Sequence, residues 1–329
     1  MRLAHIAIAT PNRCGLYETA RELVAAERSL GVDARIVDPR PIPSLYPESG
    51  EDRGVPLADM GWAVSADVVV SHSGHDETPV AESDQPIIHV AHGRPLSTFL
   101  GERAGNAPAY SYQVVRSQSD RYRACVTFWP EYEPYLRELW IGKPVHVLHP
   151  TADLEHWCPG ETTYDFAGKA GGYNVVMADP WCRADVSPFH TIHAFALFRR
   201  IHPEAKLHIY AAETNQRGYA ALFRVLGDSL GVVQGWASDL RRVYRAADML
   251  ITPHRIYTRS IREAMACGIQ VVSGRDAHVE DIEQFAVLMA NRRERPLPTR
   301  TLAQVLFDPT KAANAMIRLA ESVAMEAVT

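Results

Sequence analysis

Residues 248–273, DMLITPHRIYTRSIREAMACGIQVVS, constrain the fold more than any other part of this chain. An apolar run at 249–251 ends at Pro253, and a helical repeat then continues until Gly268, through Ile261, Ala264 and Met265. A second apolar run follows at once. The pattern predicts a strand, a loop, a helix and a second strand with almost no slack between them. In a parallel sheet, the loop after the first strand faces the ligand crevice, so function is expected there.

Length and composition predict two domains of ordinary size. The chain has 329 residues, of which 47% are hydrophobic, and a single domain of this length would be unusually large. The first apolar run, MRLAHIAIAT, is too short for a signal peptide, and no later run approaches the ~20 residues that span a bilayer. We therefore expect a cytoplasmic protein with no membrane span.

Charge and cysteine usage exclude several classes of partner. Residues 1–150 contain 14 Lys and Arg and 19 Asp and Glu, and residues 151–329 contain 20 basic and 20 acidic residues. Neither half is basic overall, as a nucleic-acid-binding domain normally is, so a nucleic-acid partner is unlikely. The five cysteines are scattered, with no C-x-x-C pair, so neither a disulfide framework nor a zinc site is indicated. No D-x-D spacing occurs either, and we expect no bound metal.

The first half of the chain has the pattern of a parallel α/β unit. Strands are expected at 3–10 and 34–37, with an amphipathic helix at 19–30 between them. Gly15 lies in the intervening loop, where a residue without Cβ lets a ligand approach the backbone, although a plain turn is the alternative.

Two more buried strands follow in this half. They are ADVVVS at 66–71 and PIIHVA at 86–91, and the second is followed directly by His92. His92 is thereby placed at the carboxyl end of a strand, as is His72 after the other one. A solvated or satisfied core histidine is the alternative for both.

The second half repeats the alternation of strands and helices. A strand near 174, a helix at 188–201 and a strand at 207–211 are expected, with Arg183 in the loop before the helix. The last apolar-periodic stretch, 308–327, predicts a C-terminal helix.

The segment AADMLITPHRIYTRSIREAMACGIQVVSG is similar to the nucleotide-binding segment of family 4 glycosyltransferases of the GT-B fold. In that family, a strand ending in Pro precedes Glu-x7-Glu and then Ala-Met-Ala-Cys-Gly. The resemblance implies two Rossmann-like domains with a crevice between them. They would be residues 1–150 on the acceptor side, with a helix at 311–329 crossing back, and residues 151–310 on the nucleotide-sugar side.

The resemblance also implies the roles of particular residues. Glu263 matches the second Glu, whose carboxylate accepts hydrogen bonds from the donor ribose. Arg255 stands where the first Glu holds the sugar, and His92 matches a histidine near the reacting carbon. These two are the catalytic candidates. The candidate donor-binding residues are Gly15, Arg183, Gly235, Trp236, Arg259, Ser260, Ile261 and Glu263.

The predicted function is transfer of a sugar from a nucleotide-diphosphate donor, such as a UDP- or GDP-sugar, to an acceptor. The donor is the substrate, and no cofactor or metal is expected. Arg side chains and helix N-termini can stabilise the leaving diphosphate in place of a metal ion. Retention of configuration follows by family analogy. One alternative is a homologue that binds a nucleotide sugar without transferring it. Another is transfer to a modified DNA base or a protein.

Overall fold

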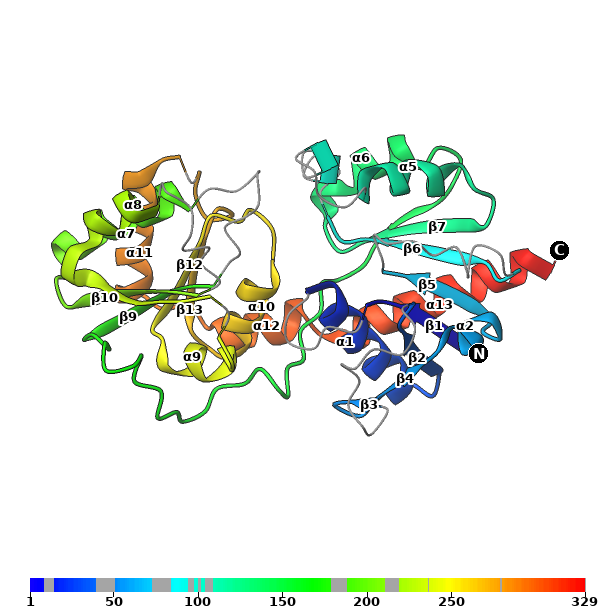
Figure 1. Ribbon diagram of the computed structural model, residues 1–329, viewed down its shortest axis with the longest axis horizontal. Helices are drawn as coiled ribbons and strands as arrows, with labels where there is room; N and C mark the ends of the chain where they lie inside the picture. The colour runs from blue at the N-terminus through cyan, green and yellow to red at the C-terminus, as the bar shows by residue number, and fades with distance from the viewer. Residues whose placement is uncertain are drawn as a thin grey trace. The chain divides into compact units, whose positions relative to one another are not determined.

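The computed structural model describes residues 1–8, 15–39, 51–72, 84–93, 98–99, 102–103, 109–178, 188–210, 219–235, 237–278 and 280–328. The chain divides into two compact units. The first comprises Met1–Thr151 and Asp308–Thr329, and the second comprises Ala152–Phe307. Each unit is built on its own parallel sheet (Figure 1).

The first unit has an eight-stranded sheet in the order β3-β4-β2-β1-β5-β6-β7-β8. Adjacent strands run parallel except for the short antiparallel pair β3 and β4. The central strands β5 and β6 consist mostly of Val, Ile and Ala and are buried on both faces, as is typical of a parallel sheet. The strands are β1 (Arg2–Ile6), β2 (Asp33–Val37), β3 (Glu51–Asp52), β4 (Val55–Ala58), β5 (Val68–Ser71), β6 (Ile87–Ala91), β7 (Tyr122–Thr127) and β8 (Val145–Val147).

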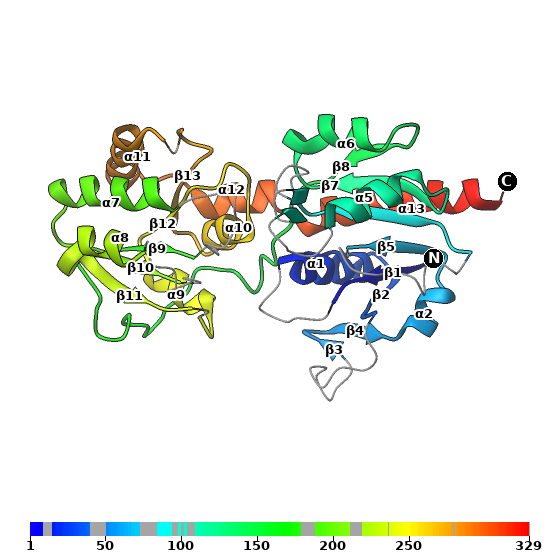
Figure 2. The same cartoon turned by 45° about the horizontal axis from the view of Figure 1, so that its top comes forward.

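The helices of the first unit include the last helix of the chain. They are α1 (Gly15–Ser29), α2 (Met60–Val64), α5 (Ala109–Gln118), the 3-10 helix η1 (Pro130–Tyr132), α6 (Glu133–Leu139) and α13 (Pro309–Val328). Helix α13 packs along α1, and the two lie side by side in both views (Figure 1, Figure 2). Its buried residues, among them Ala312, Met316 and Ala320, recur at helical spacing and form that contact face.

The second unit has a five-stranded parallel sheet in the order β11-β10-β9-β12-β13. Its strands are β9 (Tyr173–Met177), β10 (Ala205–Ile209), β11 (Leu230–Val233), β12 (Met249–Thr252) and β13 (Gln270–Ser273). Its helices are α7 (Phe189–Ile201), α8 (Tyr219–Leu226), η2 (Gly227–Ser229), α9 (Leu240–Ala246), α10 (Arg259–Ala266), α11 (Ile282–Glu294) and α12 (Thr299–Leu306).

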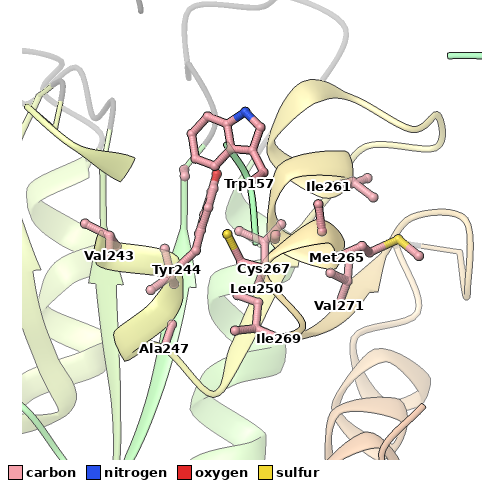
Figure 3. Close-up of a cluster of buried hydrophobic side chains, with 14 of the residues drawn as sticks. Trp157, Val243, Tyr244, Ala247, Leu250, Ile261, Met265, Cys267, Ile269 and Val271 are labelled. Atoms are coloured by element: carbon pink, nitrogen blue, oxygen red, sulfur yellow. The ribbon is translucent and has the colours of Figure 1, made fainter. Parts of the chain in front are cut away.

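Two apolar cores lie on opposite faces of this second sheet. Along β9 and β12, Val175 and Met249 belong to one core, while their neighbours Val176 and Leu250 belong to the other, as the two-residue period of a strand dictates. Helices α7 and α11 cover the first core, and α9, α10 and α12 cover the second. Figure 3 shows part of the second core, where α10 contributes Ile261 and Met265.

The elements predicted from periodicity are found, with shifted ends. The strand expected at 3–10 ends at residue 6, and residues 9–14 lie outside the described part of the chain. Helix α1 begins at Gly15, whereas the expected helix began at residue 19, because Thr19 and its neighbours complete a first turn on Gly15. Within the described residues, no helix has both the length and the apolar character needed to cross a bilayer.

Candidate functional site

The strand order in the sheet of the second unit changes direction between β9 and β12. Strands β10 and β11 add on one side of β9, whereas β12 and β13 add on the other. Ligands of open parallel sheets bind outside the carboxyl ends of the strands at such a switch point. The segment that leaves β12 there is residues 253–258, which leads into α10.

Helix α10 begins where the sequence offers hydroxyl groups. Thr258 is the N-cap, with an extended ψ of 168°, and its Oγ1 lies 2.8 Å from Oγ of Ser260. Its side chain makes no capping bond to the backbone. The helix ends before Gly268, whose φ of +88° suits glycine.

Glu263 is held by an arginine of the same helix. Nε and Nη2 of Arg259 donate to Oε1 of Glu263 at 2.8 and 2.6 Å. Glu263 is only 6% exposed, and both side chains of the pair are largely buried. The carboxylate predicted to bind ribose is thus one half of a buried ion pair. Sequence reasoning missed this pairing, although the i, i+4 spacing signals it.

Ser260 and Ile261 are buried in the first turn of α10, but only Ile261 packs in the core. Cys267, just beyond the helix, is also buried, which together with the nearby Glu263 raises the pKa of its thiol to about 12. This thiol therefore stays protonated and packs as a small apolar group.

Arg255 lies outside α10 and is exposed. Had the helix continued through it, Arg255, Arg259 and Arg262 would share one face, but the helix starts only at Arg259. The helix therefore does not align the three arginines on one face. A cation that the sequence did not single out, Arg275, donates from Nη1 to the carbonyl of Arg255 at 3.3 Å and stacks over the ring of Tyr257 at 4.1 Å.

The other donor-binding candidates of this unit are less defined. Arg183 and Trp236 lie outside the described residues. Gly235 follows β11 and is exposed, and a Cβ added to it would meet no atom within 4 Å. The site that the structure builds in this unit therefore rests on the start of α10.

The first unit places its two candidates at strand and helix ends. Gly15 is the exposed first residue of α1 rather than a loop residue. His92 directly follows β6, and its ring lies 5.8 Å from that of Phe128. It thereby lies at the carboxyl edge of the sheet, as predicted.

His92 is the end of a row of imidazoles that sequence reasoning did not anticipate. Its Nε2 lies 2.9 Å from Nδ1 of His72, and Nε2 of His72 lies 2.9 Å from Nδ1 of His5. Nε2 of His5 in turn lies 2.8 Å from Oε2 of Glu27 on α1. The sequence signal that could have indicated this row is His5, a polar residue within the apolar run 3–8. In the described part of the chain, this row included, no group of three His, Cys, Asp or Glu could hold a metal ion.

Among solved structures, the Anabaena protein Alr3699/HepE in complex with UDP and glucose aligns with a TM-score of 0.70 at 12% identity, over 98% of this chain and 100% of that one. The pneumococcal O-GlcNAc transferase GtfA, in complex with UDP and GlcNAc, gives 0.68 at 10% identity over 98% and 99%. Sucrose-phosphate synthase from Thermosynechococcus elongatus gives 0.67 at 15% identity over 98% of each chain.

At these identities the likeness establishes the fold, and the protein has the GT-B fold of two Rossmann-like domains. Residues 189–322 match the model of the family "Glycosyl transferases group 1". No curated protein matches the chain by sequence. The chain thus carries a group 1 glycosyltransferase domain, which confirms the predicted fold class and the predicted resemblance. Membership of family 4 in particular stays a prediction.

Proposed function

We propose that this protein transfers a sugar from a nucleotide-diphosphate donor to an acceptor, without a metal ion and with retention of configuration. The observation that carries the proposal is the buried carboxylate of Glu263 in the second turn of α10, within the matched domain and on the helix that follows the switch point of its sheet. Support also comes from the relatives solved with UDP and a sugar, which share the fold.

The chemistry of α10 suits a nucleotide. An ionised carboxylate only accepts hydrogen bonds, and the two hydroxyls of a ribose donate them. Arg259 fixes Oε1 of Glu263, so the carboxylate is held in one orientation. Preorganised acceptors of this kind bind hydroxyls with less loss of side-chain entropy.

A leaving diphosphate needs positive charge, which arginines and helix N-termini supply without a metal. Arg255, at the loop that precedes α10, is the candidate in the described part of this unit, and Arg183 stays a prediction outside it. Because a guanidinium accepts no hydrogen bonds, Arg255 suits phosphate or carboxylate oxygens and not sugar hydroxyls.

A second candidate function is binding of a nucleotide sugar without transfer. The observation that favours it is the exposed Arg255 at the position where the resembling family has the sugar-holding Glu. Release of the nucleotide diphosphate from a bound donor separates the two functions, because only the transferase consumes its donor.

The test is a thermal-shift panel of UDP-, GDP-, ADP- and TDP-sugars on the wild type, Glu263→Gln and the matched control Glu283→Gln. Glu283 is an exposed first-turn glutamate of α11 in the same unit. We expect at least one donor to raise the melting temperature of wild type and control, with a much smaller rise for Glu263→Gln. Equal shifts in all three proteins would remove Glu263 from the site, and no shift with any donor would contradict the proposal.

A further inference from the structure

A second arginine, Arg275, lies against the segment that leaves β12. Strands β12 and β13 are parallel neighbours, so the residues that follow them emerge at the same carboxyl edge of the sheet. Nη1 of Arg275 donates to the carbonyl of Arg255 at 3.3 Å, and the guanidinium stacks on the ring of Tyr257, 4.1 Å from its centroid. These two contacts place Arg275 beside Arg255.

Gly274 makes this close approach possible. Its N–H donates to the carbonyl of Thr252 at 3.1 Å, and a Cβ added to it would lie only 2.4 Å from the carbonyl oxygen of Pro253. Any side chain at this position would therefore push the loop after β13 away from the segment after β12. The glycine thus keeps Arg275 within reach of that segment.

Arginines outnumber acidic residues around this contact. Between the end of β12 and Asp276, the chain contains four arginines and two acidic residues. Glu263 is paired within α10, and Asp276 accepts from Nη2 of Arg292 at 3.2 Å. Both acids thus have arginine partners other than Arg255 and Arg275. These two arginines are exposed, and an arginine side chain stays charged in proteins.

The contact of the two arginines lies to one side of the switch point. That point is between β9 and β12, whereas Arg275 follows β13 at the edge of the sheet. From the middle of the switch point to β13 is one and a half strand spacings, or roughly 7 Å. A hexose ring spans such a distance. An anion beside Arg275 is therefore separate from a diphosphate bound at the switch point, and a sugar attached to that diphosphate reaches it.

We propose that the transferred sugar carries a carboxylate that Arg255 and Arg275 bind, so that the donor is a nucleoside diphosphate uronate. A planar guanidinium matches the two oxygens of a carboxylate, and stacking on Tyr257 restricts the orientation of Arg275. A neutral sugar offers only hydroxyls, which do not balance the charge of two neighbouring arginines. This assignment deepens the proposed function and rests on it.

The test compares donors that share a nucleotide and differ in whether the sugar carries a carboxylate. UDP-glucose is compared with UDP-glucuronate, and GDP-mannose with GDP-mannuronate, each titrated into the protein by calorimetry. Charge-assisted hydrogen bonds to the carboxylate should make the acidic member of at least one pair bind about tenfold more tightly than the neutral member. Equal affinities within both pairs, or tighter binding of the neutral donors, would overturn the proposal.

Two variants assign the preference to the arginines. Arg275→Gln and Arg255→Gln should each weaken binding of the acidic donor much more than binding of its neutral counterpart, whereas a residue that only supports the loop would affect both donors alike. Arg295→Gln is the matched control, because Arg295 is an exposed arginine at the C-terminal end of α11 in the same unit, and it should keep the preference. An unchanged preference in both folded variants, or equal losses for the two donors, contradicts the proposal.

The two proposals fail in different ways. Neutral donors that bind as tightly as acidic ones and lose their sugar support transfer and overturn only the uronate assignment. If none of the four donors binds, the proposed function is contradicted and the uronate assignment falls with it.

Discussion

Removing Glu263 should destabilise the protein as well as weaken donor binding, because its carboxylate is buried against Arg259. On a solvated helix face, the same change would leave the fold intact. Here Glu263→Ala leaves a guanidinium that is 14% exposed without the oxygen that accepts its Nε and Nη2. The chain offers a control in the exposed pair of Glu133 and Arg137, which has the same i, i+4 spacing and the same 2.6 Å separation between Nη2 and Oε1.

The magnitudes follow from burial. A hydrogen bond to a charged group contributes about 1.5–3 kcal/mol where solvent is largely excluded. The control pair has side chains that are 58% and 33% exposed, and an exposed helical pair contributes only about 0.3–0.5 kcal/mol. The coupling energy between Arg259 and Glu263 should therefore exceed that between Arg137 and Glu133 roughly fivefold.

The assay is a pair of double-mutant cycles by urea denaturation, with each residue changed to Ala singly and together. The cycle removes the separate effects of each truncation and leaves the pairwise free energy. A coupling energy for the buried pair no larger than that of the exposed pair would refute the reasoning that burial gives this ion pair its strength.

Three further predictions concern the same unit. Arg255→Glu should weaken donor binding in calorimetry by more than the few tenths of a kcal/mol that a screened surface charge contributes, and equal affinity would retire its phosphate role. Burial lowers the pKa of His208 from 6.5 to about 4, so the unfolded state binds the proton first and the free energy of unfolding should fall between these pH values, by roughly 3 kcal/mol at most. Urea unfolding at pH 7 and pH 4.5 measures this, and His208→Gln showing the same pH slope would contradict it. Gly231→Ala should destabilise by about 1–3 kcal/mol in thermal unfolding, because its Cβ would lie within 2.4 Å of the buried His208 ring, whereas Gly235→Ala meets open space. Equal melting temperatures would contradict this.

Local periodicity predicted the elements around α10. The apolar run at 249–251, the helical repeat through Met265 and the stop at Gly268 are all short-range patterns, and the structure places a strand, helix and strand there. The start of α10 was harder, since nothing in the local pattern distinguished Arg255, before the helix, from Arg259, within it. The loop position predicted for Arg255 agrees with a helix that begins at Arg259.

The imidazole row could not be predicted because it depends on tertiary register. His5 and His72 meet only because β1 pairs with β5, and Glu27 joins them only when α1 packs on that sheet. Sequence alone placed His72 and His92 at strand ends, but it gave no reason to connect them through His5. Buried polar contacts between distant segments need the fold itself.

The central claim is sugar transfer without a metal, and the most direct measurement is turnover of mass-tagged UDP-, GDP-, ADP- and TDP-sugars in EDTA, read as released nucleotide diphosphate. The account predicts release from at least one donor, undiminished by the chelator and strongly reduced in Glu263→Gln. Release that stops in EDTA and returns with Mn²⁺ or Mg²⁺ would contradict the metal-independent mechanism, and binding with no release from any donor would contradict transfer itself.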